Sequence, residues 1–476
     1  MIETEKKDMF LGRTTELSEL NKLYDMEGFK FIVIYGRRRV GKTALMAEFT
    51  KDKDSIFYIS IEQNDKAALE TFSVKVLERF SAGASIIDSF PSWDKAFSYI
   101  TEQAGSTRLV LAIDEYPYLA SGCPSISSIL QKHIDTGFGA SNLFLILCGS
   151  SMSFMENQVL GYNSPLYGRR TAQFKLEPLN YLQTAEACPN LSTVSNALIY
   201  GIAGGIPHYI NKLAIKKDNG IDKAITENLL EKTSYLFEEP ANLLKQELRE
   251  PATYNAIIAA MASGAARLND ISTKTSLDYS LCSKYLSVLI SLDIVGKKSP
   301  IFDKTKNKTL YFIKDNLFSF WYRFVPDNIS QIMADKSSLV FKNEVKPQLN
   351  HYMGKIFEEI CCQYLIYGAD NLPFIIKEIG SWWGGNPKTK TQEEIDILAT
   401  NGKSAIFGEC KWQTDLIDLA VLKNLKRKAE LFDKFENKYY YLFSKSGFTM
   451  GVSDVAQKDN SIRLITLADM YLVSGA

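Results

Sequence analysis

The stretch GRRRVGKT, residues 36–43, decides the fold of the first part of this 476-residue chain. It fits the phosphate-binding pattern G-x-x-x-x-G-K-[ST] and lies between the apolar run FIVIY (31–35) and the helical stretch TALMAEF (43–49). Its two glycines allow a tight turn whose backbone N–H groups face phosphates. Lys42 can neutralise the β- and γ-phosphates, and the Thr43 hydroxyl can ligate Mg²⁺. The sequence therefore predicts a site for ATP and Mg²⁺ formed by Gly36, Arg37, Arg38, Arg39, Val40, Gly41, Lys42, Thr43 and Ala44.

Further apolar runs extend the pattern set by residues 31–35. They are nearly continuous in apolar residues, as strands of a parallel sheet covered on both faces must be. Amphipathic stretches between them supply the crossover helices, so we expect a doubly wound α/β domain with a parallel sheet. The runs are IFYISI (56–61), LVLAI (109–113), LFLILC (143–148) and AQFKLEPL (172–179).

An acidic pair ends one of these runs, in LVLAIDEY. Asp114 suits a partner that holds Mg²⁺ through water, and Glu115 suits the base that polarises an attacking water molecule. Such a pair is weak evidence alone. At this distance after a phosphate loop, it predicts nucleotide hydrolysis.

Beyond the apolar runs, the chain changes character twice. Helical periodicity dominates residues 180–250, and residues 251–326 contain three helical stretches followed by two β-like segments. Three helices and a lysine-rich hairpin resemble a winged helix-turn-helix. A smaller α/β unit then occupies residues 327–476, after a core of residues 1–179.

The first half of the chain resembles the archaeal-type, AAA-related ATPases, relatives of the signal-transduction ATPases with numerous domains. FLGRTTELSELNKLY (10–24) resembles the N-terminal box of that family, which packs beside the adenine. The resemblance therefore implies that Gly12 and Arg13 contact the nucleotide. LFLILCGSS resembles the sensor strand of the family, which places Ser150 or Ser151 near the γ-phosphate.

Two further segments carry the same resemblance. GGIPHYI (204–210) resembles the helical lid, although glycine and proline also interrupt helices without such a role. PLYGRRT (165–171) resembles the arginine motif. Arg169 or Arg170 could stabilise charge on the transferred phosphoryl group, within one chain or across a contact in a homo-oligomer. The alternative is a pair of solvated arginines.

Charged residues in the last unit form the pattern E…D…E-x-K, which resembles the PD-(D/E)-x-K nuclease fold. Glu358 or Glu359 lies on a predicted helix, Asp396 on a strand, and Glu409 and Lys411 on the next strand. Residues two apart on a strand project to the same face. In that family, the residues matching Asp396 and Glu409 bind Mg²⁺, while the lysine orients water or stabilises developing charge. An inert domain that only binds DNA or a protein is the alternative.

A DNA contact is expected from the winged helix and from the last unit. Trp382 and Trp383, beside two glycines, are interpreted as a turn that packs under a sheet, with stacking on a base as the alternative. The alternative for the winged helix is a docking module. If the winged helix does bind DNA, its candidate phosphate contacts are Ser280, Ser283, Lys284, Ser287, Lys304, Lys306 and Lys308.

Composition limits the remaining possibilities. Lys+Arg 55 balances Asp+Glu 55, so any nucleic-acid site must be a local patch. The apolar runs are far shorter than the ~20 residues needed to span a bilayer, and the N-terminus lacks the apolar segment of a signal peptide. Seven scattered cysteines indicate reduced thiols, and we expect a cytoplasmic protein without a membrane contact.

Overall fold

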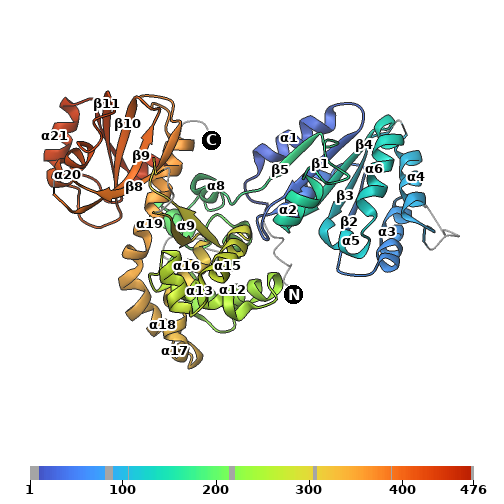
Figure 1. Cartoon of the computed structure of the whole chain (residues 1–476), viewed down its shortest axis with the longest axis horizontal. Coiled ribbons are helices and arrows are strands. Elements are labelled where there is room, and N and C mark those ends of the chain that lie inside the picture. The colour runs from blue at the N-terminus through green and yellow to red at the C-terminus, as the bar shows by residue number, and fades with distance from the viewer. Residues whose placement is uncertain are drawn as a thin grey trace. The chain divides into compact units, whose positions relative to one another are not determined.

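The computed structural model describes residues 10–80, 89–105, 107–213, 220–303, 308–387 and 389–472. The chain divides into two compact units. The first unit holds Met1–Pro178 and Ile206–His208, and the second holds Leu179–Gly205 and Tyr209–Ala476. Figure 1 shows the elements of both units along the chain. Within the described residues, no helix is long and apolar enough to cross a membrane.

A parallel five-stranded sheet in the order β2-β3-β4-β1-β5 forms the centre of the first unit. β1, β3 and β4 are buried along their whole length, which explains why their sequences are apolar without alternation. The expected doubly wound α/β fold is confirmed. The strands are β1 (Lys30–Tyr35), β2 (Ser55–Ile59), β3 (Leu109–Asp114), β4 (Leu143–Gly149) and β5 (Ala172–Lys175).

The fifth strand is shorter than its apolar run, which continues to Leu179. Leu176 still donates its N–H to the Tyr35 carbonyl at 2.7 Å. The Leu176 carbonyl then lies so close to Gly36 that a Cβ there would be 2.4 Å from it. The chain therefore ends its ladder where it passes the phosphate loop.

Helices cover both faces of this sheet (Figure 1). On one face, α1 and α2 pack on β4 through Tyr24, Phe49 and Phe144, whose ring centroids lie 5.4–5.9 Å apart. The later helices share a large apolar core with the other face. The helices are α1 (Thr14–Asp25), α2 (Lys42–Thr50), α3 (Asp65–Phe80), α4 (Trp93–Ala104), α5 (Tyr116–Gly122) and α6 (Ile126–Thr136).

The second unit begins with helices and then forms a three-helix bundle with a hairpin. The hairpin strands are antiparallel, and the order of elements is the one predicted for residues 251–326. The aromatic helix α16 packs on the bundle: Tyr322 Oη donates to Asn255 Oδ1 of α13 at 2.6 Å. The elements are α8 (Tyr181–Glu186), α9 (Thr193–Ala203), α12 (Tyr235–Glu247), α13 (Pro251–Ala262), α14 (Leu268–Thr275), α15 (Tyr279–Ser291), β6 (Val295–Lys298), β7 (Leu310–Ile313) and α16 (Asn316–Phe324).

A mixed sheet in the order β12-β11-β10-β9-β8 completes the second unit. β8 and β9 run antiparallel to their neighbours, whereas β10, β11 and β12 are parallel. The elements are α19 (Leu349–Gln363), β8 (Glu378–Gly385), β9 (Gln392–Thr400), β10 (Ser404–Lys411), α20 (Leu419–Ala429), β11 (Asn437–Ser444), α21 (Met450–Lys458), β12 (Ile462–Thr466) and α22 (Leu467–Tyr471).

The interpretation of Trp382 and Trp383 as a turn is wrong, because both lie within strand β8. The two glycines that suggested a turn pair with β9, and the strand contains a bulge between Gly380 and Trp382. Trp382 packs edge-on against Phe432, with ring centroids 5.0 Å apart.

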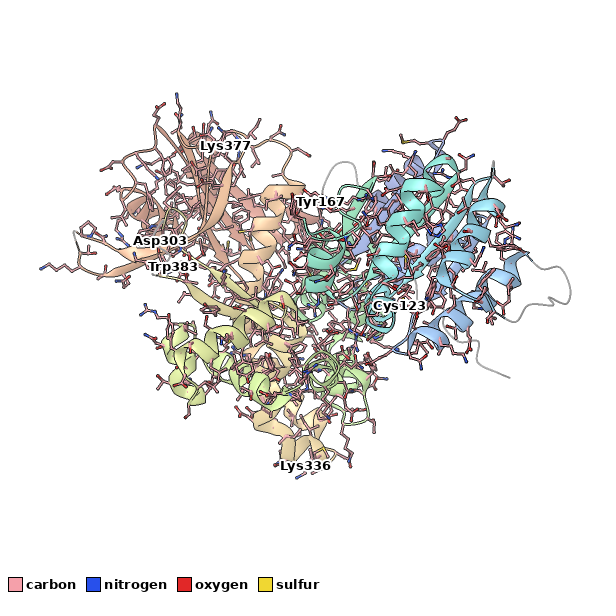
Figure 2. The ribbon with its side chains drawn as sticks, turned by 45° about the vertical axis from the view of Figure 1, so that its right-hand side comes forward. Cys123, Tyr167, Asp303, Lys336, Lys377 and Trp383 are labelled. Atoms are coloured by element: carbon pink, nitrogen blue, oxygen red, sulfur yellow. The ribbon has the colours of Figure 1, made fainter. Side chains whose placement is uncertain are left out.

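The hairpin of the three-helix bundle packs against β8. The Ile301 N–H donates to the Ser381 carbonyl at 3.0 Å, and Lys298 Nζ lies 5.6 Å from the centre of the Trp383 ring. Figure 2 labels Asp303, which follows Ile301 in the chain, and Trp383 of β8. The wing lysines Lys304 and Lys306 lie outside the described residues, and Lys308 is exposed.

Candidate functional site

The phosphate loop connects β1 to α2 in the first unit. Gly36 and Gly41 have φ values of +152° and +94°, conformations that favour glycine. Lys42 is buried, and its Nζ donates to the carbonyls of Gly36 at 3.0 Å and Arg37 at 2.9 Å. Its burial lowers the Lys42 pKa. The loop can therefore cradle a polyanion with backbone N–H groups and one lysine.

The carboxylates at the end of β3 lie beside this loop. Thr43 Oγ1 donates to Asp114 Oδ2 at 2.6 Å, and the Glu115 N–H donates to Asp114 Oδ1 at 2.9 Å. Asp114 is buried, whereas Thr43 is exposed. An exposed hydroxyl next to a carboxylate supplies the hard oxygen ligands that Mg²⁺ prefers.

Glu115 is held by the sensor strand. The backbone of Glu115 has a φ of +50°, a value that residues other than glycine rarely adopt. Glu115 Oε2 accepts hydrogen bonds from Ser150 Oγ at 2.8 Å and from the Ser150 N–H at 3.2 Å. Of the two predicted serines, Ser150 is therefore the one that contacts the acidic pair. These two hydrogen bonds hold the Glu115 carboxylate in a fixed orientation.

Arg13 donates a hydrogen bond to the backbone of the phosphate loop. It is 3% exposed, and its Nη2 donates to the Val40 carbonyl at 2.9 Å and to the Glu177 carbonyl. Nη1 pairs with Glu16 at 3.0 Å. Gly12 and Arg13 have φ values of +61° and +64°, so the chain turns sharply before α1. A direct contact of either residue with nucleotide stays a prediction.

The two arginines of the arginine motif have different surroundings. Arg169 forms a two-point ion pair with Asp135, with Nε–Oδ1 and Nη2–Oδ2 distances of 2.8 and 2.7 Å. Arg170 interacts electrostatically with Tyr35, whose pKa is raised by burial and lowered in part by this cation.

A second group of charged side chains lies in the C-terminal sheet. β9 and β10 are antiparallel, and their paired register ends at Ile397 opposite Gly408, so Asp396 and Glu409 lie just beyond its last pair. Asp396 Oδ2 also accepts the Cys410 N–H at 2.8 Å. Asp396 and Glu409 thus lie near each other at the point where the paired register ends.

Glu358 is the helix glutamate that lies near Asp396. Loss of solvation, with the neighbouring charge of Asp396, raises the Glu358 pKa to about 7, while Lys298 and Lys355 oppose the rise. Burial and the charge of Glu409 raise the Asp396 pKa to about 6. Loss of solvation is the main cause of both rises, so both groups lie in surroundings that disfavour a charged carboxylate.

Glu409 is the carboxylate with the strongest protein partners. It is buried, and its two oxygens accept from Lys411 Nζ at 2.7 Å and Lys428 Nζ at 3.1 Å. Within the described ranges, no three His, Cys, Asp or Glu side chains gather closely enough to hold a metal ion. A cation here would have to compete with the two lysines for Glu409.

Comparison with known proteins agrees with the site in the first unit. Residues 10–213 match a family described as an ATPase domain predominantly from Archaea. Residues 321–429 match a family described as archaeal and bacterial proteins of unknown function. An uncharacterised protein of Methanocaldococcus jannaschii is 34% identical over 447 residues, which is 92% of this chain and 96% of the relative. The chain belongs to this family of archaeal-type ATPases.

Other similar proteins match a smaller share of this chain. An uncharacterised ATP-binding protein of M. jannaschii is 42% identical over 45 residues, or 10% of this chain and 76% of that protein. The solved ORC2 protein of Aeropyrum pernix, in ADPNP–ADP complexes, has a TM-score of 0.46 at 16% identity and covers 70% of this chain and 97% of its own. A signal-transduction ATPase with a tetratricopeptide repeat sensor from Pyrococcus horikoshii has a TM-score of 0.31 at 14% identity, covering 76% and 50%.

The sequence of the ATPase did not lead us to two lysines that lie near the carboxylates of the C-terminal sheet. Lys428 follows the buried residues Leu422 and Leu425 on the apolar stripe of α20, and that position on the stripe was an available signal. Lys298 reaches Glu358 from the hairpin, about 60 positions earlier in the sequence. No local pattern connects the two, because only the packing of the hairpin on β8 brings them together.

The raised pKa of Glu358 predicts a pH-dependent effect of Glu358→Gln on stability. A carboxyl group whose pKa is higher in the folded state destabilises the fold as pH rises from its unfolded toward its folded pKa, here from 4.5 to about 7. We expect the variant to be more stable than the wild type at pH 8, by at most about 3 kcal/mol. At pH 4 the two should be nearly equal.

Thermal unfolding at both pH values measures this effect. Glu436→Gln, an exposed carboxylate of the same unit, is the control and should show no such difference. An equal effect of Glu358→Gln at pH 4 and pH 8 would contradict the raised pKa.

Proposed function

We propose that this ATPase binds ATP with Mg²⁺, hydrolyses it, and uses the nucleotide state to control a winged helix and a nuclease-like C-terminal domain that act on DNA. The observation that carries the proposal is the chain of hydrogen bonds from Thr43 through Asp114 and Glu115 to Ser150. It joins the phosphate loop, the acidic strand end and the sensor strand in one network. Phosphoryl transfer needs groups that bind phosphate, hold Mg²⁺ and position water, and this network contains candidates for these roles.

In this proposal, each residue of the network has one task. Lys42 binds phosphate oxygens, and Thr43 and Asp114 hold the Mg²⁺ that neutralises charge on the phosphates. Glu115 polarises the attacking water. Ser150 keeps the Glu115 carboxylate in place through two donated hydrogen bonds and could respond to the γ-phosphate.

The arginine motif would complete the ATP site. Arg170 is the better candidate, because Arg169 is already paired at two points with Asp135. Arg170 could stabilise charge on the transferred phosphoryl group in its own chain or in a second copy. A homo-oligomer is required in the second case.

The DNA contact would come from the three-helix bundle, acting as a winged helix. On α15, Ser280, Lys284 and Ser287 are exposed and Ser283 is partly exposed, while Cys282, Leu286 and Leu289 face the core. Lysine and serine contact phosphates without reading bases. We therefore propose binding with little sequence preference.

The C-terminal cluster would hold Mg²⁺ for DNA cleavage. Asp396 and Glu409 lie near each other, Glu358 lies near Asp396 on α19, and Lys411 lies two residues from Glu409. Their donors are carboxylate oxygens, which suit a hard cation. Lys411 would then orient water or stabilise developing negative charge.

A nucleotide-switched regulatory or scaffold protein is the alternative. One observation favours it: both oxygens of Glu409 are taken by lysines. In that case the C-terminal domain only binds DNA or a protein partner.

Replacing Lys42 with alanine tests the ATP site. The loss of a charge-assisted hydrogen bond to phosphate, about 1.5–3 kcal/mol, should weaken ATP binding at least about tenfold. Isothermal titration calorimetry measures the affinity, and circular dichroism checks the fold. Lys51→Ala is the matched control, because Lys51 is exposed at the other end of α2. Unchanged ATP affinity in a folded Lys42→Ala variant would overturn the assignment.

A further inference from the structure

Helix α19 has two functional faces. Glu358 faces the sheet that carries Asp396. Tyr352, Glu359 and Gln363 are spaced by seven and four residues, so they form one stripe along the helix, turned about 100° from Glu358. This stripe contacts helices that precede the C-terminal sheet by more than a hundred residues in sequence.

Side chains on the stripe form a network with α9. Tyr200 Oη donates to Glu359 Oε1 at 2.5 Å, and Gln363 Nε2 donates to Tyr200 Oη at 2.7 Å and to Glu359 Oε1 at 3.1 Å. Gln363 Oε1 accepts the Tyr181 N–H at 3.0 Å. Tyr200 is only 3% exposed, although Glu359 is open to solvent. The hydroxyl of Tyr200 therefore has both of its partners on α19.

Backbone contacts tighten the same junction. Tyr352 Oη lies 2.8 Å from the Gly201 carbonyl and 3.0 Å from the Asn316 carbonyl, and Asn316 Nδ2 donates to the Tyr200 carbonyl at 3.1 Å. A Cβ on Gly201 would lie 2.4 Å from the sulfur of Met353. The close approach makes α9 and α19 a packed pair, which transmits displacement instead of absorbing it.

The chain after α9 leads directly to the phosphate loop. Gly204 and Gly205 have φ values of +60° and +69°, and a Cβ on Gly205 would lie 1.9 Å from the Leu179 carbonyl oxygen. The next residues, Ile206–His208, belong to the first unit. There, Pro207 Cγ lies 3.8 Å from the place a Cβ on Gly41 would take. One short segment thus connects the loop to α9.

We propose that Tyr200 and Glu359 are positioning residues that couple nucleotide binding at the phosphate loop to the placement of Glu358 on α19. The inference rests on the proposed function, because it gives Glu358 a role in the second site. A ligand that moves residues 206–208 moves α9, and the hydrogen bonds of the stripe carry that movement to α19. Coupling of this kind is a free energy shared by two sites, with reciprocal effects on each.

Tyr200→Phe tests the coupling while keeping the ring. Hydrogen–deuterium exchange of residues 349–363 is measured with and without a non-hydrolysable ATP analogue and Mg²⁺. In the wild type, the analogue should change the exchange rates of this helix about fivefold or more, and in the variant by less than about twofold. The matched control is Tyr322→Phe, a buried tyrosine of the same unit whose hydroxyl donates to Asn255 of α13 at 2.6 Å. It should behave as the wild type does.

The outcomes separate this inference from the proposed function. If exchange in α19 does not respond to the analogue in the wild type, or responds equally in Tyr200→Phe, the coupling is overturned. If it responds in the wild type alone but neither protein cleaves linear duplex DNA with Mn²⁺, the coupling is supported and the nuclease role of Glu358 fails. If the wild type does cleave, the analogue should change its cleavage rate, and Tyr200→Phe should lose that response. Titration calorimetry should show that the variant binds the analogue normally.

Discussion

Replacing Glu115 with glutamine is expected to reduce ATP turnover by about 10²–10⁴-fold, because the variant loses the proton acceptor of the attacking water. ATP affinity should stay within a few-fold of the wild type, since Lys42, Thr43 and Asp114 remain. The amide oxygen of glutamine can still accept the hydrogen bonds that Ser150 donates to Glu115 Oε2. The change therefore removes the base and leaves its position intact. A phosphate-release assay gives the rate, and calorimetry gives the affinity.

Glu156→Gln is the matched control for this prediction. Glu156 is an exposed glutamate of the same unit, 4.0 Å from Lys175 in a surface ion pair, and its replacement should leave turnover unchanged. A Glu115→Gln variant that hydrolyses ATP at the wild-type rate would remove Glu115 from the mechanism. Such a result would leave Asp114 as the residue to examine next.

The parts of this molecule that follow from local sequence were predictable. The phosphate loop sets its own geometry through Gly36 and Gly41, and buried parallel strands need apolar residues on both faces. The acidic pair ends a strand, so its place near the loop follows from the parallel sheet. The same reasoning gave the three helices and hairpin, because periodicity and turn residues are local signals.

Features that depend on contacts distant in sequence were not predictable. The local sequence EEICC does not indicate that Glu358 faces Asp396 while Glu359 faces Tyr200. The orientation of α19 in the packed unit determines both contacts. The pairing of Arg169 with Asp135 likewise requires the packed fold. β8 was missed because glycines next to tryptophans are typical of turns, whereas pairing with β9 overrides that preference.

Replacing Asp396 with asparagine is expected to reduce Mn²⁺-dependent cleavage of linear duplex DNA by about 100-fold or more, which corresponds to about 2.7 kcal/mol of barrier. The amide oxygen can still accept the Cys410 N–H, so the strand pairing of β9 and β10 should persist. The variant loses only the negative charge that a cation would bind. ATP turnover should remain within a few-fold of the wild type, because the phosphate loop belongs to the other unit.

The control and the wild type together decide between the two functions of the C-terminal domain. Asp433→Asn, an exposed carboxylate of the same domain, should cleave as the wild type does. If the wild type cleaves and Asp396→Asn cleaves equally, the carboxylate cluster is not the site. If the wild type binds DNA but does not cleave it with either Mg²⁺ or Mn²⁺, the two lysines on Glu409 have displaced the cation. The domain is then the binding module of a nucleotide-switched protein, because a paired Glu409 leaves Asp396 and Glu358 too few free oxygens to hold a metal ion.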